Sequence, residues 1–282
     1  MSLAKQPTEA LRSRAVDNPK NQVQSAAKVF AVLRAFTADA PELTLAEIAG
    51  RGGLDRGTTY RLVHTLEDLG YLRAVPDSRR FRLTLQCLEL GFAALSADDL
   101  PGHATPLLRQ VVPGLADAAS LGVLEVGEVV YLARVESGLE RAGIVRRPGS
   151  RIGAYATALG QAMLAWLPLA EQRARLAAVP RVMLSERTLV ELEALLARLD
   201  AVRRQGFAVS DGENAYGLRT VAAPVLDAQG RPIAGISLTI AASLQPIADF
   251  CAAAAPAALR IAGELAEAVR LSLGAIAVRG RS

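Results

Sequence analysis

Between residues 23 and 83, five local patterns follow one another in an order that few folds can accommodate. Three amphipathic helical patterns come first, and two short strand patterns follow around the basic turn PDSRR. The boundaries of the second and third helical patterns carry their own start and stop signals, so the assignment does not depend on one motif. This order is typical of a winged helix-turn-helix, a fold that binds DNA in many proteins and other proteins in some.

The turn between the second and third helices is the best-marked part of this segment. The letters TLAE at residues 44–47 form a capping box, in which the hydroxyl of Thr44 and the carboxylate of Glu47 each accept a backbone amide of the other residue. The pair Gly52-Gly53 supplies the left-handed backbone that ends the second helix. Asp55 is a favourable N-cap for the third helix. The third helix is therefore predicted to be a recognition helix.

Basic and hydroxyl side chains are concentrated on this helix and in the wing. Arginine can pair with a guanine edge or a phosphate, and hydroxyl groups commonly hold phosphates. We therefore predict DNA contacts from the second helix cap, the third helix and the wing, at Thr44, Arg56, Gly57, Thr58, Thr59, Tyr60, Arg61, Thr65, Arg79 and Arg80.

Composition places few limits on function but excludes some classes of site. The chain has 282 residues, of which 51% are apolar, and a net charge of +4, which is weak support for a nucleic-acid partner. No apolar run approaches the ~20 residues of a membrane span, and the first residues lack a secretory signal. Two histidines and two widely separated cysteines match no metal or redox spacing, so we expect no metal, no cofactor and a cytoplasmic protein.

After residue 101 the chain mixes helical and strand patterns, which favours an antiparallel sheet with helices packed on it. Helices are predicted at residues 103–119, 156–166, 189–205 and 247–273, and strands at residues 122–125, 129–134, 141–146, 207–210, 218–226 and 233–240. The expected organisation is α+β, with a disordered tail at residues 1–22, the winged helix-turn-helix at 23–84, a linker helix at 85–101 and a larger domain at 102–282.

Motifs for catalysis are absent from the sequence. There is no G-x-S-x-G nucleophile elbow, no G-x-G-x-x-G and no phosphate-binding loop. The only histidines are His64, in the third helix, and His103, beside the linker. We predict no catalytic residue and no enzymatic activity; a hydrolase is kept as a minor alternative.

The chain resembles the IclR-type bacterial transcriptional regulators over about residues 23–273. The resemblance is carried by LTLAEIAGRGGLDRGTTYRLVHTLEDLGYL and RFRLTLQCLELG in the first half, and by GSRIGAYATALGQAMLA and GFAVSDGENAYGLRTVAAPVLDAQGRPIAGISLTI in the second. Most positions of the family's signature are in place, while Thr220 and Leu226 depart from it. The resemblance implies a GAF-like effector-binding domain behind the winged helix. It also implies promoter or operator DNA, a small organic acid and a homodimer or tetramer as partners.

Within the family, AYATALGQAMLAWLP, YLARVES and VAAPVLDAQG look most similar to regulators of aromatic-acid catabolism, such as those for protocatechuate and p-hydroxybenzoate. Members that bind small keto acids have an acid where Ser210 stands and a cysteine where Thr220 stands. These two departures favour a neutral, hydroxyl-lined wall, which suits a carboxylate better than an acidic wall does.

The resemblance places effector contacts on six residues: Ala158, Leu159, Ser210, Thr220, Ser237 and Thr239. Free amides at the start of the helix near Thr157 suit an anion, although its small residues can equally serve close packing on the sheet. Tyr155 could stack on a ligand ring or fill the core. Arg134, Arg141 and Arg146 are candidate carboxylate clamps if their strands face the site. A ligand-binding protein whose winged helix contacts another protein remains the main alternative.

Overall fold

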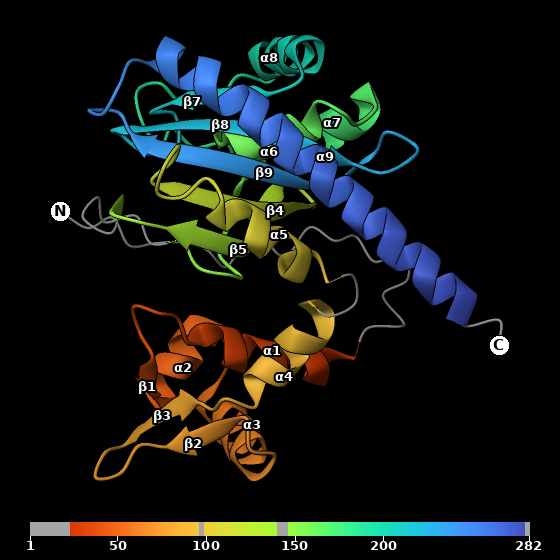
Figure 1. Ribbon diagram of the computed structural model, residues 1–282. Coiled ribbons are helices and arrows are strands. Elements are labelled where there is room, and N and C mark those ends of the chain that lie inside the picture. The colour runs from red at the N-terminus through yellow and green to blue at the C-terminus, as the bar shows by residue number, and fades with distance from the viewer. Residues whose placement is uncertain (1–22, 96–98, 140–145, 280–282) are drawn as a thin grey trace. The chain divides into compact units, whose positions relative to one another are not determined.

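The computed structural model describes residues 23–95, 99–139 and 146–279, which form two compact units (Figure 1). The N-terminal unit comprises residues 23–95, and the C-terminal unit comprises the described residues from 99 onward. The predicted tail at residues 1–22 and the candidate Arg141 lie outside the described residues. Of the predicted strand at residues 141–146, only Arg146 is described, and it has no regular secondary structure.

The N-terminal unit is a winged helix-turn-helix, as predicted. Its elements are α1 (Gln24–Ala35), β1 (Glu42–Thr44), α2 (Leu45–Gly52), α3 (Arg56–Asp68), β2 (Leu72–Ala74), β3 (Arg80–Leu83) and α4 (Cys87–Leu95). The two predicted strands are joined by β1, which was not predicted, in a sheet with the order β1-β3-β2. The core packs α1, α2 and α3 on this sheet through Val32, Ile48, Val63, Leu66 and Phe81.

The C-terminal unit is built on a six-stranded antiparallel sheet with the order β6-β5-β4-β9-β8-β7. Its strands are β4 (Ala118–Glu125), β5 (Glu128–Glu136), β6 (Arg151–Gly153), β7 (Ala208–Asp211), β8 (Leu218–Leu226) and β9 (Pro232–Ala241). Its helices are α5 (Leu100–Arg109), the short 3₁₀ helix η4 (Ala154–Ala156), α6 (Ala158–Leu164), α7 (Leu169–Ala177), α8 (Leu192–Gln205) and α9 (Ile247–Arg279). The predicted α+β class is confirmed.

Helices cover both faces of this sheet, and each face has its own core (Figure 1). On one face α5 and α9 pack against alternate strand residues such as Leu121, Val221 and Leu238. On the other face α6 packs on β8 and β9, and α8 packs on α6. Because side chains alternate along a strand, the residues between the α9-side positions must point toward α6.

Two predicted elements of the C-terminal unit differ in the structure. The predicted helix at residues 103–119 is wrong at its end, because α5 stops at Arg109 and Ala118 already belongs to β4. Alanines in this stretch favour a helix locally, but β4 is a central strand covered on both sides, where small apolar residues fit. Leu100 and Pro101 were predicted in the linker helix and instead form the first turn of α5. The helix α7 was not predicted.

None of the helices in the described ranges is long and apolar enough to cross a lipid bilayer.

Candidate nucleic-acid interface and ligand site

The turn between α2 and α3 is fixed by caps at both ends. The hydroxyl of Thr44 accepts the amide of Glu47 at 3.3 Å, and the Glu47 carboxylate accepts the amide of Thr44 at 2.8 Å. The amide of Thr44 and then its hydroxyl, which both donate to this carboxylate, hold the pKa of Glu47 below its ordinary value. Gly53 ends α2 at φ +63°, and Asp55 caps α3 by accepting the amide of Thr58 at 2.8 Å. The start of α3 therefore has a defined orientation relative to α2.

The outer face of α3 presents a group of exposed side chains to solvent. The exposed residues on this face include Arg56, Gly57, Tyr60, Arg61 and Thr65, and Tyr60 is 55% exposed. Within the described ranges, neither Arg56 nor Arg61 lies within ion-pair distance of a carboxylate. This face can therefore donate hydrogen bonds to an anionic or base-edge partner without first breaking an internal ion pair.

Thr59 does not belong to this face, contrary to the prediction. Its side chain is completely buried, and its hydroxyl donates to the carbonyl of Asp55 at 2.9 Å. A residue held in the core of the unit cannot reach a base or a phosphate. The hydroxyl of Thr44 is also engaged, because it donates to Glu47 at 2.9 Å within the cap.

The two predicted wing arginines have different environments. Arg79 is exposed in the turn before β3, and no ion pair engages it within the described segments. Arg80 instead folds back, donating to the carbonyl of Glu42 at 2.8 Å and to the carboxylate of Glu47 at 3.3 Å. Arg80 lies just after the wing turn, at the start of β3, but its guanidinium is engaged by an acceptor from β1 and one from α2, which nothing in the sequence indicated.

In the C-terminal unit, hydroxyl side chains form a continuous row across four strands. We call this set the hydroxyl row: Ser120, Ser210, Thr220, Ser237 and Thr239. Thr220 pairs with Ser210 on one side and with Thr239 on the other, and Ser237 pairs with Ser120. Directly paired residues share a face of an antiparallel sheet, and the residues alternating with these lie in the α9-side core. The hydroxyl row therefore faces α6.

One guanidinium group, that of Arg134, contacts this row, and a second, that of Arg146, lies near the phenol of Tyr131. Arg134 pairs with Ser120 across β4 and β5, and it donates to the Ser120 hydroxyl at 3.0 Å and to the Glu136 carboxylate at 2.6 Å. Only 8% of the Arg134 side chain is exposed. Burial raises the pKa of Tyr131, and the positive charges of Arg146 and Arg134 act against this rise. Both arginines are therefore near one buried phenol on the α6 side of the sheet.

The start of α6 lies directly over the sheet. Ala158 and Leu159 are buried, and in the part of the chain that the structure describes no carbonyl or side chain accepts from their amides. Thr157 caps the helix by accepting the amide of Gly160 at 2.9 Å. Tyr155 is part of the core on this side of the sheet: it is buried, and its hydroxyl both donates to and accepts from the backbone of Val182 at 2.8 Å.

Gly160 is required for the close approach of α6 to η4. A methyl group at this position would overlap the backbone of Ala154. We expect Gly160→Ala to lower the free energy of unfolding of the C-terminal unit by about 1–3 kcal/mol, the usual cost of overpacking. For a unit of this size, the thermal midpoint should fall by about 2–12 °C.

The matched control for this prediction is Gly263→Ala. Gly263 lies on the exposed side of α9, where an added methyl meets no atom within 4 Å. Alanine is the better helix former, so this change should leave the midpoint unchanged or raise it. A Gly160→Ala protein that melts with the wild type in a circular dichroism scan would show that α6 is not packed as described.

Several residues that the sequence reasoning missed adjoin the two candidate sites. They are Ser120 within the hydroxyl row, Tyr131 near Arg134, and Ser25 and Lys28 in the N-terminal unit. Ser120 lies beside Ser237 only because β4 pairs with β9, so no pattern in the neighbouring sequence could have identified Ser120 as a site residue. No group of three potential metal-ligating side chains occurs among the residues described.

Comparison with known proteins places both units in one family. Residues 25–76 match the profile described as the IclR helix-turn-helix domain. Residues 92–271 match the profile described as the bacterial transcriptional regulator IclR C-terminal region.

Individual relatives agree with these matches. The chain is 32% identical to the transcriptional regulator KdgR of Escherichia coli K12 over 253 residues, covering 89% of this chain and 95% of KdgR. It is 33% identical to the Pca regulon regulatory protein of Pseudomonas putida over 230 residues, covering 82% and 78%. A crystal structure of an IclR homolog from Microbacterium hydrocarbonoxydans, complexed with 4-hydroxybenzoate, superimposes with a TM-score of 0.74 at 25% identity, covering 86% of this chain and 98% of the homolog.

Proposed function

The chain belongs to the IclR family of bacterial transcriptional regulators, and we propose that it binds operator DNA through α3 and the wing under the control of an organic acid. The observation that carries the DNA-binding part is the outer face of α3, where exposed Arg56 and Arg61 lack acidic partners within the described ranges. Arg80 differs from these two arginines, because its guanidinium is already engaged by Glu42 and Glu47. The contacts we propose are Arg56, Gly57, Thr58, Tyr60, Arg61, Thr65 and Arg79.

The proposed effector site is the α6 side of the sheet. Arg134 is the group best placed to hold a carboxylate, because it is buried beside the hydroxyl row and already donates to Ser120. The amides of Ala158 and Leu159 and the hydroxyls of Ser237 and Thr239 add neutral hydrogen-bonding groups around it. Charge-assisted hydrogen bonds of this kind are stronger than neutral ones, so the site favours an anion.

We propose an aromatic acid as the effector. The homolog from Microbacterium hydrocarbonoxydans was crystallised with 4-hydroxybenzoate, and one curated relative regulates the Pca regulon. Ser210 and Thr220 are neutral hydroxyl residues, so this wall of the site does not repel a carboxylate. A phenol or catechol ring adds hydroxyl groups that the row can bind.

Calorimetry tests this assignment with protocatechuate, p-hydroxybenzoate and β-ketoadipate. We expect saturable heat with at least one of them, and a change in the fluorescence of Trp166, the only tryptophan, which follows the end of α6. If none of the three acids gives heat or a fluorescence change, the aromatic-acid proposal is wrong.

We further propose that the protein acts as a homodimer or tetramer. A single winged helix reads few base pairs, and joined copies reach a useful affinity through paired half-sites. Exposed apolar side chains on α1 and α4, Phe30 at 49%, Leu88 at 51% and Leu90 at 56%, support a contact between copies in the N-terminal unit. The effector can change operator affinity only by binding two arrangements of these copies unequally.

Two other functions remain distinguishable by experiment. If the winged helix binds a protein instead of DNA, affinity for duplex DNA will be weak and will not fall steeply with salt. If the C-terminal unit is a hydrolase, the purified protein will turn over generic esters. The named relatives are transcriptional regulators, which supports a regulatory function over a catalytic one. The same relatives support a location in the cytoplasm, where a regulator meets its promoter.

A further inference from the structure

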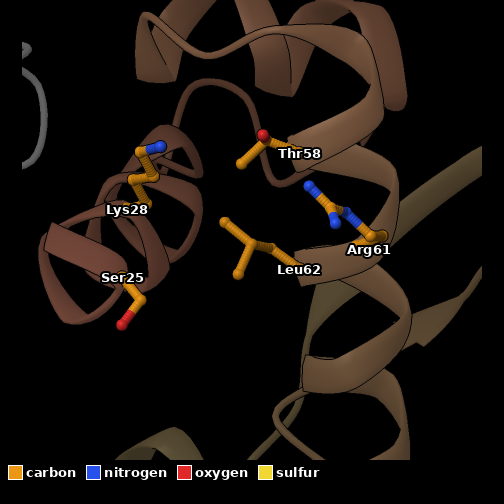
Figure 2. Close-up of a pocket in the computed structure, with 5 residues that line it drawn as sticks. All are labelled: Ser25, Lys28, Thr58, Arg61 and Leu62. Carbon is orange, nitrogen blue, oxygen red and sulfur yellow. The ribbon is translucent and has the colours of Figure 1, made fainter.

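A cleft of about 340 Å³ opens between α1 and α3 in the N-terminal unit. Figure 2 shows the side chains that line it: Ser25, Lys28, Thr58, Arg61 and Leu62. The first two come from α1 and the other three from α3, so the cleft exists only because these two helices pack together. Its lining combines two cations, two hydroxyls and one apolar side chain.

Neither cation in the cleft is neutralised by a described carboxylate. Across the described ranges, no acidic group lies within ion-pair distance of Lys28 or Arg61, whereas Arg80 and Arg82 pair with Glu47 and Glu42. Both cationic side chains are exposed. An anion entering the cleft would therefore meet two cations that remain available for binding.

The beginning of α3 adds to the positive field. Asp55 caps this end of α3, and its carboxylate accepts the amide of Thr58. That hydrogen bond is the main reason its pKa is lowered, and the charge of Lys28 lowers it further. Lys28 thus lies close to the N-terminus of α3, where the partial positive charge of the helix also favours an anion. The single charge of Asp55 offsets only part of this.

We propose that the cleft binds one backbone phosphate of the operator, so that α1 joins α3 in holding the duplex. Lys28 and Arg61 supply the charge, the hydroxyls of Ser25 and Thr58 donate hydrogen bonds, and Leu62 forms an apolar wall. Phosphate contacts fix the register of a protein on DNA, whereas base contacts specify the sequence. Lys28 therefore positions the recognition helix without selecting among base pairs.

This proposal rests on the proposed DNA-binding function, and Lys28→Gln tests it in the full-length protein. Binding to the protein's own promoter duplex is measured by fluorescence anisotropy from low to high salt. Removal of one phosphate contact should flatten the dependence of log K on log salt by about 0.9 for each copy that contacts DNA. The loss of affinity should be the same on the promoter and on a scrambled duplex.

Arg34→Gln is the matched control. Arg34 is exposed on the same helix, but its guanidinium lies over the ring of Phe30 at 5.7 Å and does not line the cleft. The substitution Arg34→Gln removes one positive charge, as Lys28→Gln does, and should leave the salt dependence of promoter binding as in the wild type. An equal flattening in both variants would mean that net charge alone matters, and would overturn the proposal.

Neutral methylphosphonates, introduced one at a time into the promoter, locate the contact. We expect one position in each half-site at which the substitution weakens the wild type and the Arg34→Gln protein but not Lys28→Gln. If every position weakens Lys28→Gln as much as the wild type, the cleft holds no phosphate. A wild type that binds no duplex at all would instead remove the proposed function itself.

Calorimetry with inorganic phosphate distinguishes a free ion from a phosphate in DNA. We expect no saturable heat, because a single exposed cleft holds a lone ion weakly. Saturable heat that Lys28→Gln abolishes would identify a site for a free phosphate and would overturn the assignment to the DNA backbone.

Discussion

Replacing Arg61 by alanine should weaken operator binding by about 100-fold to 20,000-fold while leaving effector binding unchanged. A hydrogen bond from its guanidinium to the charged phosphate in the cleft contributes about 1.5–3 kcal/mol. A dimer loses the contact in both half-sites, so the total is about 3–6 kcal/mol, and each 1.4 kcal/mol corresponds to about tenfold in affinity. Arg61 is exposed on α3 and has no ion pair within the described ranges, so its removal should not disturb the fold.

Anisotropy with the promoter duplex measures the affinity, and calorimetry with the effector supplies the check on folding. Arg34→Ala removes the same charge from α1 and should bind the promoter with nearly wild-type affinity. An Arg61→Ala protein with the operator affinity of the wild type would show that this residue does not contact DNA.

Replacing Arg134 by glutamine should weaken binding of a carboxylate effector by about 10-fold to 150-fold, and the operator complex should lose its response to the effector. A hydrogen bond to a charged group contributes about 1.5–3 kcal/mol. Glutamine removes the charge but keeps a donor that can still reach Ser120, which lies across the strand pair. Operator affinity without effector should stay unchanged, because the DNA contacts belong to the N-terminal unit.

Arg219→Gln is the control for this change. Arg219 is also largely buried and paired with a carboxylate, that of Asp211 at 2.9 Å, but it alternates with Thr220 and so points away from the hydroxyl row. If the two variants lose effector affinity equally, the effect comes from general weakening of the unit. If Arg134→Gln binds the effector like the wild type, the carboxylate is held elsewhere.

The parts of the fold that local chemistry determines were predictable from the sequence. The capping box at Thr44, the turn at Gly53 and the cap at Asp55 depend on residues three or four positions apart, and all three are present. The strand β8 was predicted with its observed limits because turns flank it on both sides. Elements that depend on distant pairing were missed, as β1 shows: three residues form a strand only because β3 lies beside them.

The candidate sites divide in the same way. Spacing along α3 placed Arg56, Tyr60 and Arg61 on an exposed face, but a polar side chain such as Thr59 gave no local sign of its burial. Arg80 looked like a free cation until the fold brought Glu42 and Glu47 to it. Pairing between distant strands assembles the hydroxyl row, and packing of α1 on α3 forms the cleft, so neither could be derived from sequence spacing.

The most direct test of the account is the affinity of the purified protein for its own promoter and for a scrambled duplex of equal length, each with and without the effector acid found by calorimetry. We predict a clear preference for the promoter at physiological salt, and a change in promoter affinity when the acid is added. Equal affinity for the two duplexes, unaltered by any of the acids, would contradict the proposal that a ligand-controlled recognition helix binds an operator.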